Sequence, residues 1–180
     1  MLEKSQIRAE IRALKSTLTT NEKEQAAKAV FTNLVKLQIW DNAKNILLYY
    51  SLPDELQTVS FLEQIIDKNI FLPKVDGNNL IVLPYSKNSL QQGAFSIHEP
   101  LGDICINPSD LDLIIVPGIA YDKEMNRLGR GKGYYDKLLI QCNAYKIGVC
   151  YDFQLIDKIP NEKHDVKMDM IITPTIIIRK

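Results

Sequence analysis

Glycines and basic residues alternate in one short segment of the chain. Gly129, Gly131 and Gly133 are interleaved with Arg130 and Lys132. Glycine lets a backbone come close to a ligand, and the two side chains between the glycines each carry a positive charge. This combination suits a polyphosphate. The alternative interpretation is a solvated turn whose basic residues only keep it in water.

The spacing within this segment excludes two common phosphate-binding motifs. A Walker loop would need a glycine at the position of Asn126 and a serine or threonine at the position of Gly133. The dinucleotide fingerprint G-x-G-x-x-G does not fit the glycine spacing either. The segment is therefore a candidate phosphate site of another type.

The elements around the segment support a ligand site there. Residues 111–116 are apolar apart from Asp112 and are followed by Pro117 and Gly118, which predicts a buried strand and its end. Residues 134–142 have a helical pattern. Because α/β folds bind anions where a strand leads through a loop into a helix, we expect the ligand between these two elements.

The remaining apolar periodicity predicts an alternation of helices and strands. Helices are expected at residues 2–18, from a capping box of Thr19 and Glu22 to near Trp40, and at residues 59–67. Strands are expected at residues 45–50, 70–72, 80–83, 145–150 and 170–173, with a turn at Asp76-Gly77 between the second and third. Residues 86–93 are polar and are expected to form a flexible surface loop, the most mobile element.

Strands that are apolar on both faces and alternate with helices define the expected fold class. They indicate an α/β fold with a mostly parallel sheet and helices on both faces, a Rossmann-like three-layer arrangement. A chain of 180 residues with 46% hydrophobic residues fits one domain, residues 1–180. No obvious unpaired apolar patch is visible, which favours a monomer.

Charge and cysteine content indicate which binding partners and which cellular compartment to expect. The 22 basic and 22 acidic side chains cancel, so no positive excess favours binding to nucleic acid. The N-terminus has no apolar stretch of a signal peptide, and the apolar runs are too short to span a membrane. Cys105, Cys142 and Cys150 have no metal-ligand spacing and are interpreted as buried thiols in a reducing compartment, so we expect a cytoplasmic protein.

The strand, the Pro-Gly pair and the sequence RLGRGKGYYD at residues 127–136 together resemble the signature of the 5-formyltetrahydrofolate cyclo-ligase family. The resemblance extends along the chain. It includes KSQIR at residues 4–8, SLPDELQT at residues 51–58 and DVKMD at residues 165–169. Chain length and motif order also match the family.

The resemblance implies roles for individual residues. ATP would be bound by Lys4, Arg8, Arg127, Leu128, Gly129, Arg130, Gly131, Lys132, Gly133, Tyr134 and Tyr135. The folate substrate would contact Tyr50, Glu55, Arg130, Gly131, Lys132, Gly133 and Tyr134. Arg130 and Lys132 would be catalytic, and Asp136 and Asp169 would hold Mg²⁺.

Several of these residues have simpler interpretations from spacing alone. Lys4 and Arg8 could form a solvated basic face of the first helix. Glu55 could be a loop residue or a charge at a helix N-terminus. Asp136 could pair with Lys132 on a helix, a contact that contributes only a few tenths of a kcal/mol.

The family resemblance implies one reaction, the ATP- and Mg²⁺-dependent conversion of 5-formyltetrahydrofolate, possibly polyglutamylated, to 5,10-methenyltetrahydrofolate, ADP and phosphate. The formyl oxygen would attack the γ-phosphorus, and N10 would then close the ring as phosphate leaves. Two other hypotheses remain. One is a sugar-phosphate isomerase or CoA transferase on a similar scaffold, which would not hydrolyse ATP. The other is a non-catalytic nucleotide- or folate-binding protein.

Overall fold

The structure is a computed structural model that describes residues 3–93, 98–102, 104–162 and 165–180. Its helices are α1 (Lys4–Ser16), α2 (Thr20–Leu34), α3 (Gln38–Asn42), α4 (Val59–Leu62) and α5 (Tyr134–Leu139). The strands of the central sheet, in spatial order, are β12 (Ile177–Arg179), β11 (Met170–Ile172), β9 (Tyr145–Val149), β6 (Leu113–Val116), β1 (Asn45–Leu47), β2 (Asn69–Asp76) and β3 (Asn79–Pro84). A small sheet contains β10 (Leu155–Ile156), β7 (Ala120–Asp122) and β8 (Arg127–Leu128), and a hairpin contains β4 (Leu90–Gln92) and β5 (His98–Pro100).

Strand direction and order in the central sheet determine where a ligand can bind. β1, β2, β6, β9 and β11 are parallel, and only the edge strands β3 and β12 are antiparallel. The chain runs from β1 outward to β2 and β3, and then returns to the other side of β1 to form β6. This reversal creates a switch point between β1 and β6, and ligands of open α/β sheets bind beside the carboxyl ends of the strands at such a point.

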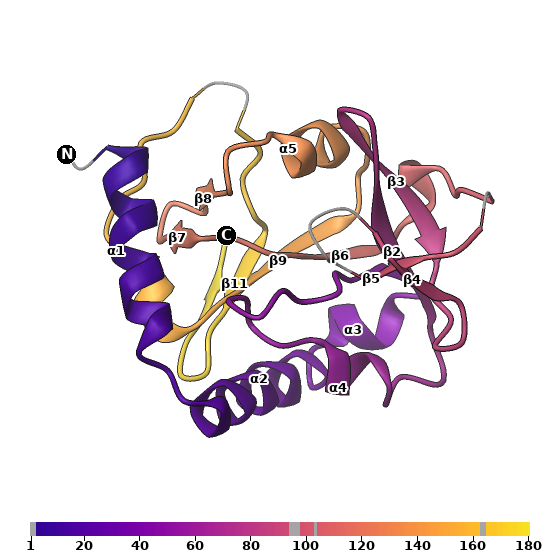
Figure 1. Ribbon diagram of the computed structural model, residues 1–180, viewed down its shortest axis with the longest axis horizontal. Coiled ribbons are helices and arrows are strands. Elements are labelled where there is room, and N and C mark those ends of the chain that lie inside the picture. Colours follow the sequence, from indigo (N-terminus) through magenta and orange to yellow (C-terminus); the bar gives the residue numbers. More distant parts are fainter. Residues whose placement is uncertain (1–2, 94–97, 103, 163–164) are drawn as a thin grey trace.

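Helices cover both faces of the sheet, as the sequence predicted (Figure 1). Side chains of β6 alternate between two cores: Leu113 and Ile115 pack in the core that contains α2, α3 and α4. Ile114 and Val116 pack in the core that contains α5. Because successive side chains of a strand point to opposite faces, a strand that is apolar throughout must be covered on both sides. The mostly parallel α/β fold is confirmed.

Helix α1 lies at one end of the molecule, against the small sheet (Figure 1). Its apolar residues Ile7 and Ile11 are buried with Ile119, Ala120 and Leu128. These two isoleucines are four residues apart and therefore share one face of the helix. Packing of this face fixes the helix beside β8, the strand that leads into the glycine-rich segment.

The structure corrects several predicted elements. The helix expected from residue 19 to near Trp40 ends at Leu34, and α3 is a separate short helix. The helix expected at residues 59–67 covers only Val59–Leu62. Residues 86–93, expected to be a loop, contain β4, whose backbone pairs with β5. Cys142 and Cys150 are buried as predicted, but Cys105 is exposed.

Within the described residues, no helix is both long and apolar enough to cross a membrane.

Candidate functional site

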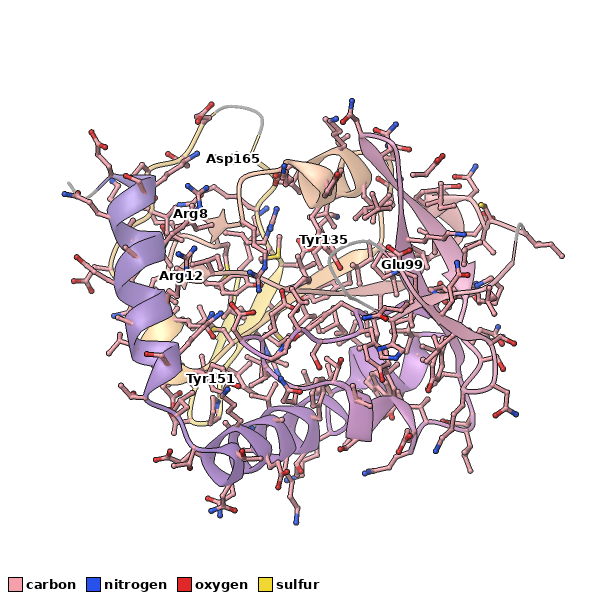
Figure 2. The ribbon with its side chains drawn as sticks, viewed as in Figure 1. Arg8, Arg12, Glu99, Tyr135, Tyr151 and Asp165 are labelled. Carbon is pink, nitrogen blue, oxygen red and sulfur yellow. The ribbon has the colours of Figure 1, made fainter. Side chains whose placement is uncertain are left out.

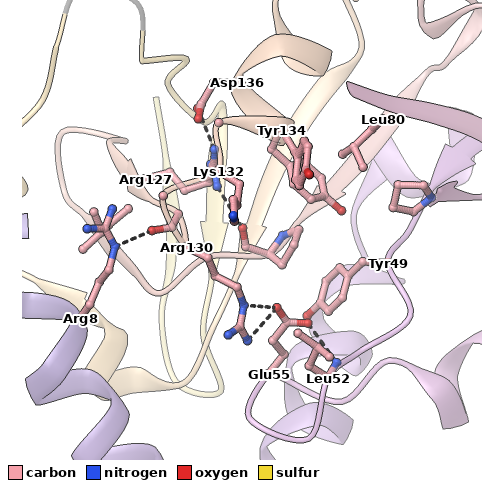
Figure 3. Close-up of a pocket in the computed structure, with 18 of the residues that line it drawn as sticks. Arg8, Tyr49, Leu52, Glu55, Leu80, Arg127, Arg130, Lys132, Tyr134 and Asp136 are labelled. Carbon is pink, nitrogen blue, oxygen red and sulfur yellow. Dashed lines mark hydrogen bonds and ion pairs between the residues drawn. The ribbon is translucent and has the colours of Figure 1, made fainter. Parts of the chain in front are cut away.

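A pocket of about 680 Å³ lies at the carboxyl ends of the central strands. Tyr49 and Tyr50, which follow β1, line it together with Pro117 and Gly118, which follow β6. All of residues 127–136 contribute to its wall, and Figure 3 shows the side chains of Arg127, Arg130, Lys132, Tyr134 and Asp136 around it. Its volume is within the range of small-molecule and cofactor sites, roughly 300–1,000 Å³. The pocket therefore forms at the switch point, where the topology places it.

A buried aspartate holds the turn before the glycine-rich segment. Asp122 is fully buried, and its Oδ1 accepts hydrogen bonds from the backbone N–H of Asn126 at 2.9 Å and of Glu124 at 3.0 Å. Its Oδ2 accepts from Asn126 Nδ2 and from the backbone N–H of Ile159, both at 2.9 Å. Met125, inside this turn, has a φ of 69°, which is unusual for a residue other than glycine. The hydrogen bonds of Asp122 thus fix an unfavourable turn that directs the chain into β8.

Glycine is required in the segment itself. Gly131 and Gly133 have φ values of 101° and 69°, a region that side chains with a Cβ disfavour. The carbonyl of Gly129 accepts a hydrogen bond of 2.9 Å from Arg8 Nε, so α1 contacts the segment directly. The backbone of the segment is therefore held both by its own conformation and by the first helix.

Arg127 and Lys132 have different surroundings although both are cations of the same segment. Arg127 is 4% exposed and donates from Nη2 to Asp136 Oδ1 at 2.7 Å, so Asp136 pairs with Arg127 and not with Lys132. Lys132 lines the pocket, is exposed, and forms no hydrogen bond or ion pair within the described part of the chain. Arg127 thus supports the site, and Lys132 is available to a ligand.

Tyr135 places a polar group deep in the site. Its ring lies 5.7 Å from the guanidinium carbon of Arg127. Its hydroxyl is sealed from solvent and lacks a hydrogen-bond partner among the described residues. Burial, together with the nearby charge of Glu55, raises the pKa of this phenol, so it remains protonated.

Arg130 joins the glycine-rich segment to the loop after β1. Its Nη2 lies 2.5 Å from Asp54 Oδ1. Its Nε and Nη2 each lie 3.3 Å from Glu55 Oε1, and Figure 3 shows this pair. The other oxygen of Glu55, Oε2, accepts from the backbone N–H of Leu52 at 3.0 Å. Burial alone would lower the pKa of Arg130, but the two carboxylates outweigh it and the pKa is raised. Both oxygens of Glu55 are therefore engaged inside the protein.

Hydrogen bonds across the loop of residues 51–58 hold Glu55 in place. Thr58 is fully buried and donates from Oγ1 to the carbonyl of Tyr49 at 2.6 Å, while it accepts from the backbone N–H of Ser51 at 3.1 Å. The Tyr49 hydroxyl donates to the carbonyl of Leu56 at 2.8 Å. These contacts close the loop on the end of β1, so that Glu55 faces the pocket.

Lys4, the first residue of α1, pairs with two acidic residues of the pocket wall. Lys4 Nζ is 3.0 Å from Glu162 Oε1 and 3.3 Å from Asp165 Oδ2. Burial opposes a charge on Lys4, but both hydrogen bonds favour it, and together they raise its pKa. All three residues line the pocket, and Figure 2 shows Asp165 and Arg8 on the same side of the molecule.

The structure brings nearly all the residues singled out in the sequence to one pocket. Those that line it are Lys4, Arg8, Tyr50, Glu55, Arg127, Leu128, Gly129, Arg130, Gly131, Lys132, Gly133, Tyr134, Tyr135 and Asp136.

Asp169 is the exception, and its expected pairing with Asp136 around a metal ion is not supported by the geometry. It directly precedes β11, so it lies at the amino-terminal edge of the parallel strands. Its Oδ2 accepts a hydrogen bond of 2.9 Å from the backbone N–H of Lys146 in β9. Asp165, four residues earlier in the same motif, lines the pocket instead.

The sequence interpretation also missed Asp54, Glu99 and Glu162, which line the pocket. Asp54 is the neighbour of Glu55 in the matched motif, so the sequence did contain a signal for it. Glu99 lies on β5, a strand of three residues in a segment without clear periodicity. Nothing in the sequence alone distinguishes Glu99 from a surface glutamate.

The fold and the pocket define a class: an α/β protein in which a glycine-rich segment with basic side chains lines a pocket at the switch point of a mostly parallel sheet. A model of the 5-formyltetrahydrofolate cyclo-ligase family matches residues 1–174. The chain belongs to this family.

Named relatives are similar along almost their whole length. The chain is 32% identical to a probable 5-formyltetrahydrofolate cyclo-ligase of Schizosaccharomyces pombe, over 99% of this chain and 98% of that protein. It is 31% identical to the 5-formyltetrahydrofolate cyclo-ligase of Haemophilus influenzae, over 92% of this chain and 94% of that protein. The solved 5,10-methenyltetrahydrofolate synthetase of Aquifex aeolicus is similar with a TM-score of 0.90 and 34% identity, over 98% of this chain and 92% of that chain.

Proposed function

We propose that this protein catalyses the ATP- and Mg²⁺-dependent cyclisation of 5-formyltetrahydrofolate to 5,10-methenyltetrahydrofolate, with release of ADP and phosphate. The observation that carries the proposal is one pocket in which the cationic segment of Arg130 and Lys132 faces the carboxylate loop of Glu55. Family membership supports the same substrate. We further propose that it acts as a cytoplasmic monomer of one domain.

The reaction must convert a poor leaving group into a good one. The formyl oxygen attacks the γ-phosphorus of ATP, which forms a C–O–P bond and releases ADP. N10 then attacks the formyl carbon and the ring closes. The C–O bond breaks, the oxygen leaves with phosphate, and the proton of N10 is released with it. Phosphoryl transfer of this kind depends on alignment and on cations placed where negative charge develops, so it needs no protein nucleophile.

The cations of the pocket fit this requirement. Lys132 is exposed to the pocket and lacks a partner in the described structure, so it can contact a phosphate without breaking an existing bond. Arg8 contacts the same segment through Gly129, and Arg130 contacts Glu55. We propose that Lys132 and Arg130 stabilise the charge of the transferred phosphoryl group and that Arg8 and Lys4 bind the rest of the nucleotide phosphates.

Carboxylates in the pocket fit Mg²⁺ when ATP is bound. Among the described residues, no three side chains of the types His, Cys, Asp and Glu form a metal-binding group. Mg²⁺ needs no such group, because it is usually held by one or two carboxylates together with nucleotide phosphates and water. We propose Asp136 and Asp165, both in the pocket wall, as its protein ligands. When bound, Mg²⁺ neutralises charge on the phosphates.

Absorbance of methenyltetrahydrofolate tests the proposed function. Purified protein is mixed with 5-formyltetrahydrofolate and MgATP in mildly acidic to neutral buffer, with a control that lacks ATP. We expect the chromophore only in the complete mixture. Binding of folate and ATP without any product would favour a non-catalytic binding protein, and absence of both binding events would contradict the proposal.

Removal of Mg²⁺ is expected to abolish turnover. Chelation with EDTA takes away the ion that neutralises the phosphates, whereas the apolar and hydrogen-bonding contacts of the folate remain. Folate affinity, measured by titration calorimetry with and without EDTA, should therefore stay the same while product formation stops. Restored activity after addition of excess Mg²⁺ is the control, and full activity in EDTA would contradict a role of the metal.

Substitution of Glu55 by glutamine is expected to weaken folate binding more than ATP binding. The carboxylate lies in the pocket wall and can accept a hydrogen bond from the folate, and the amide would lose a charge-assisted acceptor. It would also weaken the contact to Arg130, so a small effect on ATP is expected too. Calorimetric titrations of the variant with each ligand separate these effects, and an equal loss for both ligands would count against the assignment.

A further inference from the structure

Glu99 is a buried carboxylate in the pocket wall, at the far side from Lys4 and Arg8. Glu99 is 5% exposed, and Figure 2 shows it across the molecule from Arg8 and Asp165. Its Oε1 accepts one hydrogen bond of 3.3 Å from the backbone N–H of Val75. Its Oε2 accepts no hydrogen bond from the described residues, and Glu99 lines the pocket. One oxygen of Glu99 therefore has acceptor capacity left for a ligand.

The wall beside Glu99 is largely apolar in the described part of the chain. The pocket wall beside it includes Pro73 and Val75 of β2 and Leu80 of β3. The ring of Tyr50, also in the wall, lies 5.0 Å from the ring of His98, the neighbour of Glu99 on β5. No basic side chain of the described residues forms an ion pair with Glu99, unlike Glu55. A buried carboxylate without a cation is costly unless donors bind it, so this end of the pocket suits a flat ring with N–H groups on its edge.

The backbone around Glu99 leaves space for its carboxylate. A Cβ added at Gly93 would lie 2.0 Å from Glu99 Oε2. Any other residue at this position would have to displace the carboxylate or move the backbone. The absence of a side chain at Gly93 therefore leaves room for Glu99 Oε2 in its observed position.

Comparison with Glu55 shows which carboxylate can bind a ring edge at least cost. Glu55 already accepts hydrogen bonds on both oxygens, from Arg130 on Oε1 and from the backbone N–H of Leu52 on Oε2, so it has fewer acceptor sites left than Glu99. Oε2 of Glu99 has no hydrogen bond to a described residue that a ligand would have to break. Two adjacent N–H donors, such as the 2-amino group and N3–H of a pterin, match a carboxylate in the bidentate way. One would donate to Oε2, and the other to the second lone pair of Oε1, beside the bond from Val75.

We propose that Glu99 recognises the amino-pyrimidine edge of the pterin ring and so determines the orientation of the substrate. The proposal rests on the proposed function, since it assigns a contact within the same site. The ring packs against Pro73, Val75 and Leu80, while its 2-amino group and N3–H donate to Glu99. Because N5 belongs to the other half of the bicyclic ring, this contact directs the formyl group away from Glu99 and toward the side of the pocket that carries Arg130 and Lys132.

Glu99→Gln in the full chain tests the proposal by titration calorimetry with 5-formyltetrahydrofolate. The glutamine amide keeps one acceptor oxygen but loses the negative charge. Its NH₂ group is a donor and would face the N–H donors of the pterin ring. We expect affinity for 5-formyltetrahydrofolate to fall roughly 10- to 100-fold, the scale for a hydrogen bond to a charged group. Affinity for a non-hydrolysable MgATP analogue should not change, which also reports that the variant is folded. Glu63→Gln, which alters an exposed glutamate paired with Lys87, is the matched control and should bind both ligands like the wild type.

An analogue without the 2-amino group identifies the contact itself. The wild type should bind 2-desamino-5-formyltetrahydrofolate much more weakly than 5-formyltetrahydrofolate, whereas Glu99→Gln should bind the two with similar affinity. Gly93→Ala, which displaces Oε2, should behave like Glu99→Gln. Wild-type discrimination between the two folates in Glu99→Gln, or an unchanged affinity for 5-formyltetrahydrofolate, would overturn the proposal. If the wild type binds no folate at all, the proposed function fails instead.

Discussion

Replacement of Lys132 by alanine is expected to lower kcat by roughly 10²–10³-fold, the scale for loss of one preorganised charge-stabilising group. Lys132 is exposed and lines the pocket, so its removal breaks no hydrogen bond or ion pair within the described structure. The fold and the free energy of unfolding should therefore stay the same. Because the transferred phosphoryl group develops its charge in the transition state, the loss should appear in kcat more than in KM for either substrate.

Steady-state kinetics at saturating MgATP and 5-formyltetrahydrofolate measure this effect. Lys137→Ala is a matched control, because Lys137 is a lysine of α5 outside the pocket wall whose Nζ donates to the carbonyl of Asn78 at 2.9 Å. The control should keep wild-type kinetics. A Lys132→Ala enzyme with kcat close to that of the wild type would remove Lys132 from the catalytic residues and leave Arg130 as the main candidate.

The arrangement of the sheet was predictable because short sequence patterns, apolar strands and turn residues, recur along the chain. Ile114 and Ile115 point to opposite cores, and a strand that is apolar at both positions can only be covered on both faces. The turn at Asp76-Gly77 was predicted in the same way, since Gly77 has the positive φ of 56° that such a turn needs. The strand β8 could not be predicted, because two residues show no periodicity and their pairing with β7 depends on the distant contacts of Asp122.

The site was predictable where its residues are contiguous and was missed where tertiary structure assembles it. Residues 127–136 form one motif, and all of them line the pocket. Glu99 reaches the same pocket only because β5 packs beside β2, a contact between distant segments. Asp165 and Asp169 lie four residues apart in one motif, and the register of β11 with β9 decides that Asp169 binds the backbone of Lys146. A motif alone cannot specify which of its carboxylates faces a ligand.

Replacement of Asp122 by alanine is expected to lower the free energy of unfolding by about 3–5 kcal/mol. Asp122 is fully buried and accepts hydrogen bonds from three backbone N–H groups, those of Glu124, Asn126 and Ile159, and from Asn126 Nδ2. Alanine would leave these donors without their acceptor in the protein interior, and each buried unsatisfied group costs about 1–3 kcal/mol. Partial access of water to the opened turn would keep the total below the simple sum.

Urea unfolding followed by circular dichroism measures this loss. Asp67→Ala is the control: Asp67 is exposed, so its substitution should change stability by no more than about 0.5 kcal/mol. Asp122→Asn should also destabilise, because its amide presents a donor where backbone N–H groups already point. The same turn holds Met125 at a positive φ and leads into β8, so the folded fraction of Asp122→Ala should also lose turnover through misplacement of Lys132. An unfolding midpoint equal to that of the wild type would show that the turn keeps its conformation without Asp122, and that Gly131, Gly133 and the contact of Arg8 with Gly129 suffice to shape the phosphate site.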